Sequence, residues 1–312
     1  MIEETFGTSE QAAAETLIEL ALAEDLASVG DLTCAALIRA DEQAAVQVVA
    51  RKTGVLSGAT IGRRVFAHLD VAVRWKCHRR DGDAVSPGMA VATVSGPLRS
   101  LLIGERTMLN FMTHLSGIAS LTRCFVDAVQ GTRAVILDTR KTLPGWRLLE
   151  KYAVRCGGGT NHRMGLYDGV LIKDNHLAAW TESSSIAAAV ETARQRSPAG
   201  VSIEVEVDSL DQLEDALRGQ PDIVLLDNMH VATLVQAVAI RDRAAPSVLL
   251  EASGGVTLET VTAIAHTGVE RISVGGLTHS APALDLAFDW KSRLDGESLV
   301  NEAPAPANPR MP

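Results

Sequence analysis

The sequence predicts an α/β protein, in which an incomplete parallel α/β barrel follows a smaller N-terminal α+β unit. After Gly131, helical segments separate six short apolar runs, at 134–138, 169–173, 201–207, 222–227, 247–251 and 270–274. Strands that alternate with helices form parallel βα units, and strands that are apolar on both faces are those that helices cover. Six units are too few for an eight-stranded barrel of roughly 250 residues. An open doubly wound sheet remains an alternative, because periodicity alone does not distinguish the two.

The N-terminal elements are predicted in order from their spacing. Thr8 and Gln11 have the spacing of a capping box, and the apolar residues that follow suit a helix of about five turns. Glycine and proline turns then separate strand-like pieces, with one helix near Ile61 to Leu69. A helical period from Arg106 to Val129 connects the two units. The predicted domains are 1–117, joined by 285–297, and 118–284, with a Pro-rich disordered tail at 298–312.

Composition excludes several classes of protein. The chain has 312 residues, 46% of them hydrophobic, and a formal net charge of −9. No apolar run approaches the roughly 20 residues of a membrane span, and no secretory signal opens the chain, so we expect a cytoplasmic protein without a membrane partner. An acidic chain offers no general attraction to nucleic acid. The four cysteines form no CxxC pair and no Cys/His ligand cluster, so the sequence implies neither a disulfide framework nor a structural zinc site.

A cation-rich window interrupts this acidic chain. Residues 138–175 hold seven Lys/Arg and four Asp/Glu, a balance of +3, whereas the other residues sum to −12. Within the window, Arg147, Lys151 and Arg155 recur every four residues, which is typical of a solvated helix face. The remaining cations indicate a compact pocket for a small anion that carries several charges.

Polar residues follow every predicted barrel strand, and the carboxyl ends of barrel strands converge on one site. Arginine and lysine suit carboxylates and phosphates, and the cations of this set are Arg140, Lys141, His162, Arg163 and Lys173. Glu204 and Glu206 share one face of their strand and, with Asp227, could hold Mg²⁺, although an ion pair with a lysine is an equal alternative for Glu204.

Two glycine pairs after the last strands indicate a phosphate site. Glycine lets backbone N–H groups approach a phosphate closely, and Ser253-Gly254-Gly255 and Gly275-Gly276 stand where barrels often bind one. Gly157-Gly158-Gly159 matches no dinucleotide or Walker motif and is interpreted as a flexible turn that presents His162 and Arg163.

Several motifs together resemble the quinolinate phosphoribosyltransferase family. They include Thr139-Arg-Lys-Thr-Leu-Pro-Gly, the run from Glu150 to Asp168, Val170-Leu-Ile-Lys-Asp-Asn-His, Leu225-Leu-Asp-Asn, Glu251-Ala-Ser-Gly-Gly and Ser273-Val-Gly-Gly-Leu-Thr-His. The resemblance runs from about residue 20 to 285. It implies an N-terminal α+β sandwich domain, an incomplete barrel and a homodimer with a shared active site. It also implies that quinolinate, 5-phosphoribosyl-1-pyrophosphate and Mg²⁺ yield nicotinate mononucleotide, pyrophosphate and CO₂ for NAD synthesis.

The resemblance also implies a role for each matching residue. Quinolinate would lie among Arg140, His162, Arg163, Lys173 and, from the neighbouring subunit, Arg106. Lys141 would lie between the substrates, and Glu206 and Asp227 would serve the ribose and the metal, so that these two, Lys141 and Lys173 are the predicted catalytic residues. The 5-phosphate would be held by Ser253, Gly254, Gly275 and His279.

Three other interpretations remain open at this point. Lys173 at a barrel strand end could form a Schiff base in an aldolase. The cations could belong to an anion-binding protein without catalysis. A paralogue associated with molybdenum transport is nearer, although the intact Asn161-His-Arg and Lys173-Asp-Asn-His runs favour quinolinate.

Overall fold

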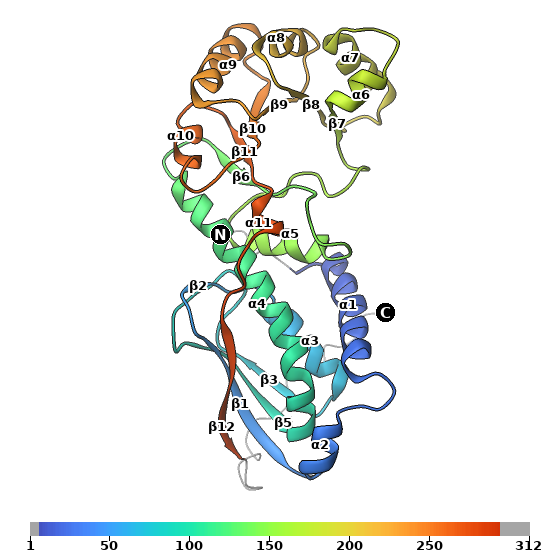
Figure 1. Cartoon of the computed structure of the whole chain (residues 1–312), viewed down its shortest axis with the longest axis vertical. Coiled ribbons are helices and arrows are strands. Elements are labelled where there is room, and N and C mark those ends of the chain that lie inside the picture. Colours follow the sequence, from blue (N-terminus) through green and yellow to red (C-terminus); the bar gives the residue numbers. More distant parts are fainter. Residues whose placement is uncertain (1–5, 294–312) are drawn as a thin grey trace, which may run out of the picture.

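The computed structural model describes residues 6–293, and the predicted tail at 298–312 lies outside them. The molecule is elongated, with an antiparallel sheet at one end and a parallel sheet at the other (Figure 1). The helices are α1 Thr8–Leu26, α2 Leu32–Leu37, α3 Ala59–Leu69, α4 Leu98–Ala128, α5 Arg147–Cys156, α6 Asp174–Ala179, α7 Ile186–Arg196, α8 Leu210–Arg218, α9 Val231–Ala244, α10 Val261–Ala265 and α11 Gly276–His279. The strands are β1 Gln43–Ala50, β2 Gly54–Val55, β3 Arg74–Cys77, β4 Ala84–Val85, β5 Ala90–Pro97, β6 Val135–Leu137, β7 Val170–Ile172, β8 Ile203–Val207, β9 Ile223–Asp227, β10 Leu249–Ser253, β11 Arg271–Ser273 and β12 Leu286–Arg293.

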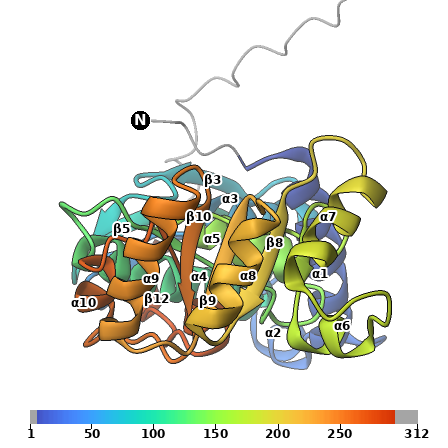
Figure 2. The same ribbon diagram turned by 90° about the horizontal axis from the view of Figure 1, so that it is seen from above.

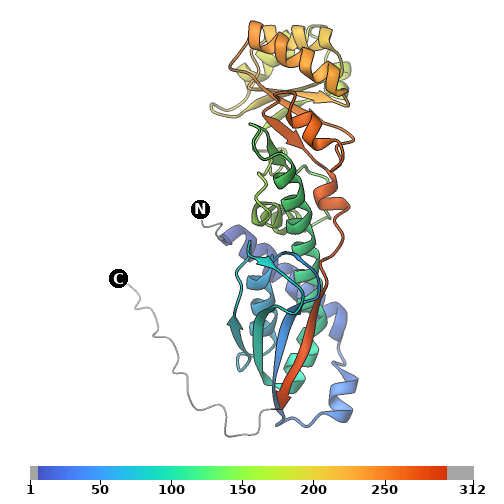
Figure 3. The same cartoon turned by 90° about the vertical axis from the view of Figure 1, so that its left-hand side faces the viewer.

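The N-terminal unit is a four-stranded sheet with the order β12-β1-β5-β3. Strand β12 comes from the far end of the chain and pairs with the whole length of β1, so the chain passes through the barrel and returns to this unit (Figure 3). Helix α1 has 19 residues, which confirms the predicted length of about five turns, but the predicted capping box is wrong. Its N-cap is Gly7, which has no side chain to cap the helix, and the Gln11 side chain donates to the Phe6 carbonyl instead.

Helix α4 connects the two units. It begins at Leu98, eight residues before the predicted start, and its 31 residues run through the predicted boundary at 117. Two of its glycines are needed for close packing. A Cβ at Gly104 would lie 2.6 Å from the Phe66 ring of α3, and one at Gly117 would lie 2.2 Å from the Pro282 carbonyl oxygen. Such glycines resemble helix breakers in a sequence, because the packing that requires them is not visible there.

The C-terminal unit is the predicted incomplete barrel. Its six strands are parallel, in the order β6-β11-β10-β9-β8-β7. The strands from β7 to β11 follow one another without a reversal, and β11 then pairs with β6, so the sheet is open between β6 and β7. A doubly wound sheet would reverse its strand order at a switch point. This topology confirms the barrel and excludes the doubly wound alternative.

Helices α8 and α9 cover the face of this sheet that is turned away from the N-terminal unit (Figures 1 and 3), and Figure 2 shows them from above. Ser209 caps α8 by accepting from the Gln212 N–H at 3.4 Å. Among residues 6–293, no helix is long and apolar enough to cross a membrane.

Candidate active site

The strand register places the predicted site residues on one face of the barrel sheet. Leu171 aligns with Glu204, Glu206 with Leu225, Asp227 with Ser253, and Glu251 with Arg271. Aligned residues of parallel strands point the same way, as do residues two apart on one strand. The shared face therefore carries Lys173, Glu204, Glu206, Asp227, Glu251, Ser253, Arg271 and Ser273.

At the carboxyl ends of β7 and β8, Lys173 forms an ion pair with Glu206. The Lys173 side chain is 42% exposed and that of Glu206 is 17% exposed, so the ammonium group remains accessible at the rim. On the next strand, Asp227 accepts a hydrogen bond from the Asn228 side chain at 2.8 Å. The rim thus combines one accessible cation with carboxylates on two adjacent strands.

Lys141 lies beside the last strand ends, although the chain reaches it 130 residues earlier. A Cβ at Gly275 would lie 3.1 Å from Lys141 Cδ and 3.3 Å from His279 Nε2, so these three residues meet. The Thr278 hydroxyl donates to the Lys141 carbonyl at 2.7 Å and ties the two loops together. The structure therefore brings Lys141, Gly275 and His279 into one cluster.

The loop after β10 requires glycine at position 254. Gly254 has φ +90°, and a Cβ there would lie 2.2 Å from the Asn228 side-chain oxygen. The Asn228 N–H also donates to the Ser253 carbonyl at 2.9 Å. This loop lies directly against the loop after β9, so Ser253 and Gly254 adjoin Asp227.

His162 lies between two buried carboxylates deeper in the barrel. Its Nε2 atom is 3.1 Å from Glu204 and 3.3 Å from Glu251, and Arg271 Nε donates to Glu251 at 2.7 Å. Burial favours the neutral ring, but the hydrogen bonds with Glu204 and Glu251 outweigh it and raise the pKa of His162 to about 9. Burial also raises the pKa of Glu204. The predicted alternative of an ion pair for Glu204 is thus realised with His162 instead of a lysine.

The other ring nitrogen of His162 favours the neutral form of the ring. Nδ1 accepts a hydrogen bond from the Arg163 N–H at 2.7 Å, and it must be unprotonated to do so. We give the carboxylates more weight, since two buried anions outweigh one neutral hydrogen bond. His162, Glu204 and Glu251 also offer ligand atoms within 4.8 Å of one another, close enough for a metal ion. The ring proton and Arg271 already balance both carboxylates, so we interpret this cluster as a charge-neutral support below the rim.

Arg140 and Arg163 form a pair of like charges. Burial and the nearby Arg140 guanidinium lower the pKa of Arg163. Arg163 Nη1 donates to the Gly169 carbonyl at 3.0 Å, and Arg140 Nε is buried without a hydrogen-bond partner among the described residues. Two neighbouring guanidinium groups with an unused donor would be stabilised by an anion between them.

Two sequence interpretations near this pair are wrong. The glycine run is packed and not flexible, because a Cβ at Gly157 would lie 2.5 Å from the Ala119 carbonyl oxygen of α4. The face of α5 that carries Arg147, Lys151 and Arg155 is not solvated. Lys151 is fully buried, and Arg155 is half-buried in an ion pair with Glu10 of α1. Helix α5 packs between α1 and α4, and the sequence of a single helix does not reveal a neighbour on its charged side.

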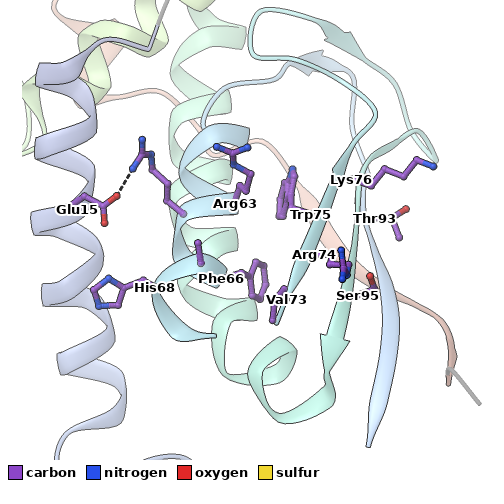
Figure 4. A pocket seen from close by; sticks show the side chains of 12 residues that line it. Glu15, Arg63, Phe66, His68, Val73, Arg74, Trp75, Lys76, Thr93 and Ser95 are labelled. Atoms are coloured by element: carbon purple, nitrogen blue, oxygen red, sulfur yellow. Dashed lines mark hydrogen bonds and ion pairs between the residues drawn. The ribbon is translucent and has the colours of Figure 1, made fainter. Parts of the chain in front are cut away.

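Arg106 does not join the strand-end cluster of its own chain. It is exposed on α4, and no hydrogen bond or ion pair within residues 6–293 connects it to the strand ends. A separate hollow of about 820 Å³ lies in the N-terminal unit, between α1, α3 and β3. Figure 4 shows Arg63, Arg74, Trp75 and Lys76 around it, and no predicted site residue lines it.

Comparison with known proteins shows the family to which the chain belongs. The family models of the quinolinate phosphoribosyl transferase N-terminal and C-terminal domains match residues 31–116 and 118–289. The chain belongs to the quinolinate phosphoribosyl transferase family. It is 46% identical to the nicotinate-nucleotide pyrophosphorylase (carboxylating) of Mycobacterium leprae, over 89% of this chain and 97% of that protein. A probable enzyme of the same name from Bacillus subtilis is 43% identical, over 85% of this chain and 89% of that protein.

Solved structures show the same family fold. The crystal structure of NadC from Streptococcus pyogenes is 39% identical and has a TM-score of 0.87, covering 93% of this chain and all of that chain. A nicotinate-nucleotide pyrophosphorylase from Francisella tularensis is 38% identical, with a TM-score of 0.83 over 90% of this chain and 96% of that chain. These relatives favour neither the aldolase nor the molybdenum-associated alternative.

Three residues that contact the His162 cluster in the structure received no role there from the sequence. Glu251 and Arg271 support His162, and Lys151 lies buried below the loop that carries His162. For Arg271 a signal existed, since a charged residue on a strand that helices cover must find a partner. Lys151 gave a misleading signal, because its spacing matched that of exposed cations.

Proposed function

We propose that this chain transfers the phosphoribosyl group of 5-phosphoribosyl-1-pyrophosphate to quinolinate, with loss of CO₂, to give nicotinate mononucleotide and pyrophosphate. Family membership supports this reaction. The observation in the site that carries it is the like-charge pair Arg140 and Arg163 beside the rim that bears Lys173 and Glu206. Such a site suits one polyanion next to another.

Quinolinate is a dianion that must leave water beside a second anion. Only preorganised cations offset that repulsion, and they do so best where water is excluded. We assign its two carboxylates to Arg140, Arg163 and Lys173, with Arg106 of the neighbouring subunit as a further contact. His162 would lie beside quinolinate on the loop before Arg163, and its contacts with Glu204 and Glu251 keep the imidazole ring at the wall of the pocket.

We assign 5-phosphoribosyl-1-pyrophosphate to the opposite half of the rim. Its 5-phosphate would accept from backbone N–H groups at Ser253, Gly254 and Gly275 and from His279, and Lys141 would lie between the two substrates. The adjacent carboxylates Glu206 and Asp227 would bind the ribose hydroxyls.

The same two carboxylates fit Mg²⁺. Each has one oxygen engaged, with Lys173 or Asn228, and its other oxygen makes no hydrogen bond among the described residues. Two carboxylates with water completing the shell is the arrangement that Mg²⁺ prefers. When bound there, Mg²⁺ would neutralise charge on the pyrophosphate.

During the reaction, these residues stabilise the charges that develop on the substrates. The bond from ribose to pyrophosphate breaks, and Lys141 stabilises the negative charge of the departing group while Glu206 and Asp227 stabilise the positive charge of the ribose. The quinolinate ring nitrogen forms the new bond. Its positive charge stabilises the electron pair that stays on the adjacent ring carbon when the carboxylate there departs as CO₂, and a proton then bonds to that carbon. Glu206 already engages the Lys173 nitrogen in an ion pair, whereas a Schiff-base lysine needs a free nitrogen to attack a carbonyl carbon.

We also propose a homodimer. Arg106 has no partner at the strand ends of its own chain, and a two-fold interface would place it in the site of the neighbouring subunit.

The reaction is tested by measuring pyrophosphate release from quinolinate and 5-phosphoribosyl-1-pyrophosphate, with each substrate omitted in turn. We expect release only with both, and a low rate when nicotinate replaces quinolinate, because nicotinate lacks the second carboxylate. Binding of both substrates without release would favour the anion-binding alternative. Covalent trapping of a carbonyl compound on Lys173 by borohydride would favour the aldolase.

A further inference from the structure

Asp138 and Lys151 form a buried ion pair that the proposed reaction does not use. Asp138 directly follows β6 and Lys151 lies on α5, and both side chains are 0% exposed. Burial raises the pKa of Asp138 and lowers that of Lys151, while their mutual attraction acts in the opposite direction on each. A buried ion pair is costly to form and often adds no stability over apolar residues. A specific structural task would account for its presence here.

The pair holds the backbone of His162 from both sides. The His162 N–H donates to Asp138 at 2.9 Å, and Lys151 Nζ donates to the His162 carbonyl at 3.4 Å. Asn161 adds a third connection, since its side chain donates to Asp138 at 2.6 Å and to the Lys151 carbonyl at 2.8 Å. Both peptide groups that flank His162 are therefore fixed by the buried pair.

This segment spans the opening of the barrel sheet. Thr160 pairs with Leu137, and its N–H donates to the Ile136 carbonyl at 2.8 Å, so residue 160 extends the sheet beyond β6. Three residues later, Arg163 donates to the Gly169 carbonyl, immediately before β7. Residues 160–163 thus connect the two edges that the six strands leave unpaired, with His162 pointing to Glu204 and Glu251 of the wall.

We propose that Asp138 and Lys151 are positioning residues, which hold segment 160–163 across the barrel opening and thereby place His162 and Arg163 for the substrate dianion. The assignment of quinolinate to these two residues rests on the proposed function, but the clamp itself does not. Without Lys151, Asp138 keeps a buried charge without its cation, and water would enter to solvate it. The segment would then lose its fixed position, while the loops after β10 and β11 would keep theirs.

The test compares Lys151→Met with Arg241→Met. Arg241 is also a buried cation, 2% exposed and paired with Glu270, but it lies on α9 away from the strand-end rim. Hydrogen exchange should speed up at the His162 amide in Lys151→Met and stay unchanged in Arg241→Met. A displacement of about 1 Å can cost roughly a hundredfold, so we expect the Kd for quinolinate to rise at least tenfold in Lys151→Met alone, with the Kd for 5-phosphoribosyl-1-pyrophosphate changing less than threefold.

Asn161→Ala repeats the test should Lys151→Met fail to fold, because it removes the third connection without leaving a lone buried charge. Faster exchange at His162 and weaker quinolinate binding support the clamp. Wild-type exchange and wild-type quinolinate binding in the folded variant overturn it. If the unaltered protein binds no quinolinate, the proposed function fails, and the exchange measurement still decides the clamp.

Discussion

Replacing Lys173 by alanine should reduce turnover by more than a hundredfold without unfolding the protein. At about 4 Å from a substrate anion, a unit charge is worth about 4 kcal/mol at an effective dielectric constant near 20. The Lys173 side chain is 42% exposed, so water screens part of this attraction. About 3 kcal/mol then remains, and each 1.36 kcal/mol is a tenfold change in rate.

The measurement is kcat with both substrates saturating, followed by pyrophosphate release, together with thermal unfolding as a control. The Lys173–Glu206 pair is partly exposed, so its loss should cost about 1 kcal/mol of stability or less. In the thermal unfolding measurement Glu206→Gln serves as a comparison, because it also removes the ion pair but keeps the Lys173 cation. A kcat for Lys173→Ala near that of wild type would remove this lysine from the mechanism.

Three further predictions concern the metal, the dimer and pH. Activity should require Mg²⁺ or Mn²⁺, and Asp227→Asn should raise the KM for 5-phosphoribosyl-1-pyrophosphate more than that for quinolinate, whereas full activity in excess chelator would contradict the metal site. Arg106→Ala and Lys173→Ala should each be nearly inactive, but refolding them together in equal amounts should restore about a quarter of wild-type activity, since half the dimers then carry one intact site. No recovery despite mixed dimers would place Arg106 in its own subunit. Burial lowers the pKa of His162, but the hydrogen bonds with Glu204 and Glu251 have the larger effect and raise it from 6.5 to about 9. These hydrogen bonds therefore stabilise the fold fully below pH 6.5, and the stabilisation is lost as the pH rises through about 9. The free energy of unfolding, measured in urea, should therefore fall more between pH 7 and 10 for wild type than for His162→Gln, and equal falls would mean that His162 is neutral.

The barrel could be predicted from the sequence because each of its strands is a short apolar run with polar residues directly after it. Once Lys173, Glu206 and Asp227 were placed at strand ends, parallel topology required them to converge. Five of the six predicted runs contain the whole strand that forms, and the run 247–251 covers only part of β10, which ends at Ser253. The contact of Lys141 with Gly275 and His279 was not predicted, since no spacing rule connects residues so far apart in the chain.

The sequence failed where packing decides the role of a residue. Lys151 has the spacing of an exposed cation, yet α1 and α4 bury the helix that carries it. Gly104, Gly117 and Gly157 allow other segments of the chain to approach closely. Only the positions of those segments in the fold show why glycine is required there. The contacts of the His162 Nε2 atom with Glu204 and Glu251 were not predicted either, because these two residues lie on separate strands far from His162 in the chain.

The most direct test of the proposed reaction follows the carbon that leaves. Quinolinate labelled in the carboxylate next to the ring nitrogen should release one labelled CO₂ for each pyrophosphate and each nicotinate mononucleotide, and only when 5-phosphoribosyl-1-pyrophosphate is present. Label placed in the other carboxylate should remain in the product. Pyrophosphate release with the label retained, or CO₂ release without the phosphoribosyl donor, would contradict the proposal that alkylation of the ring nitrogen drives decarboxylation in this site.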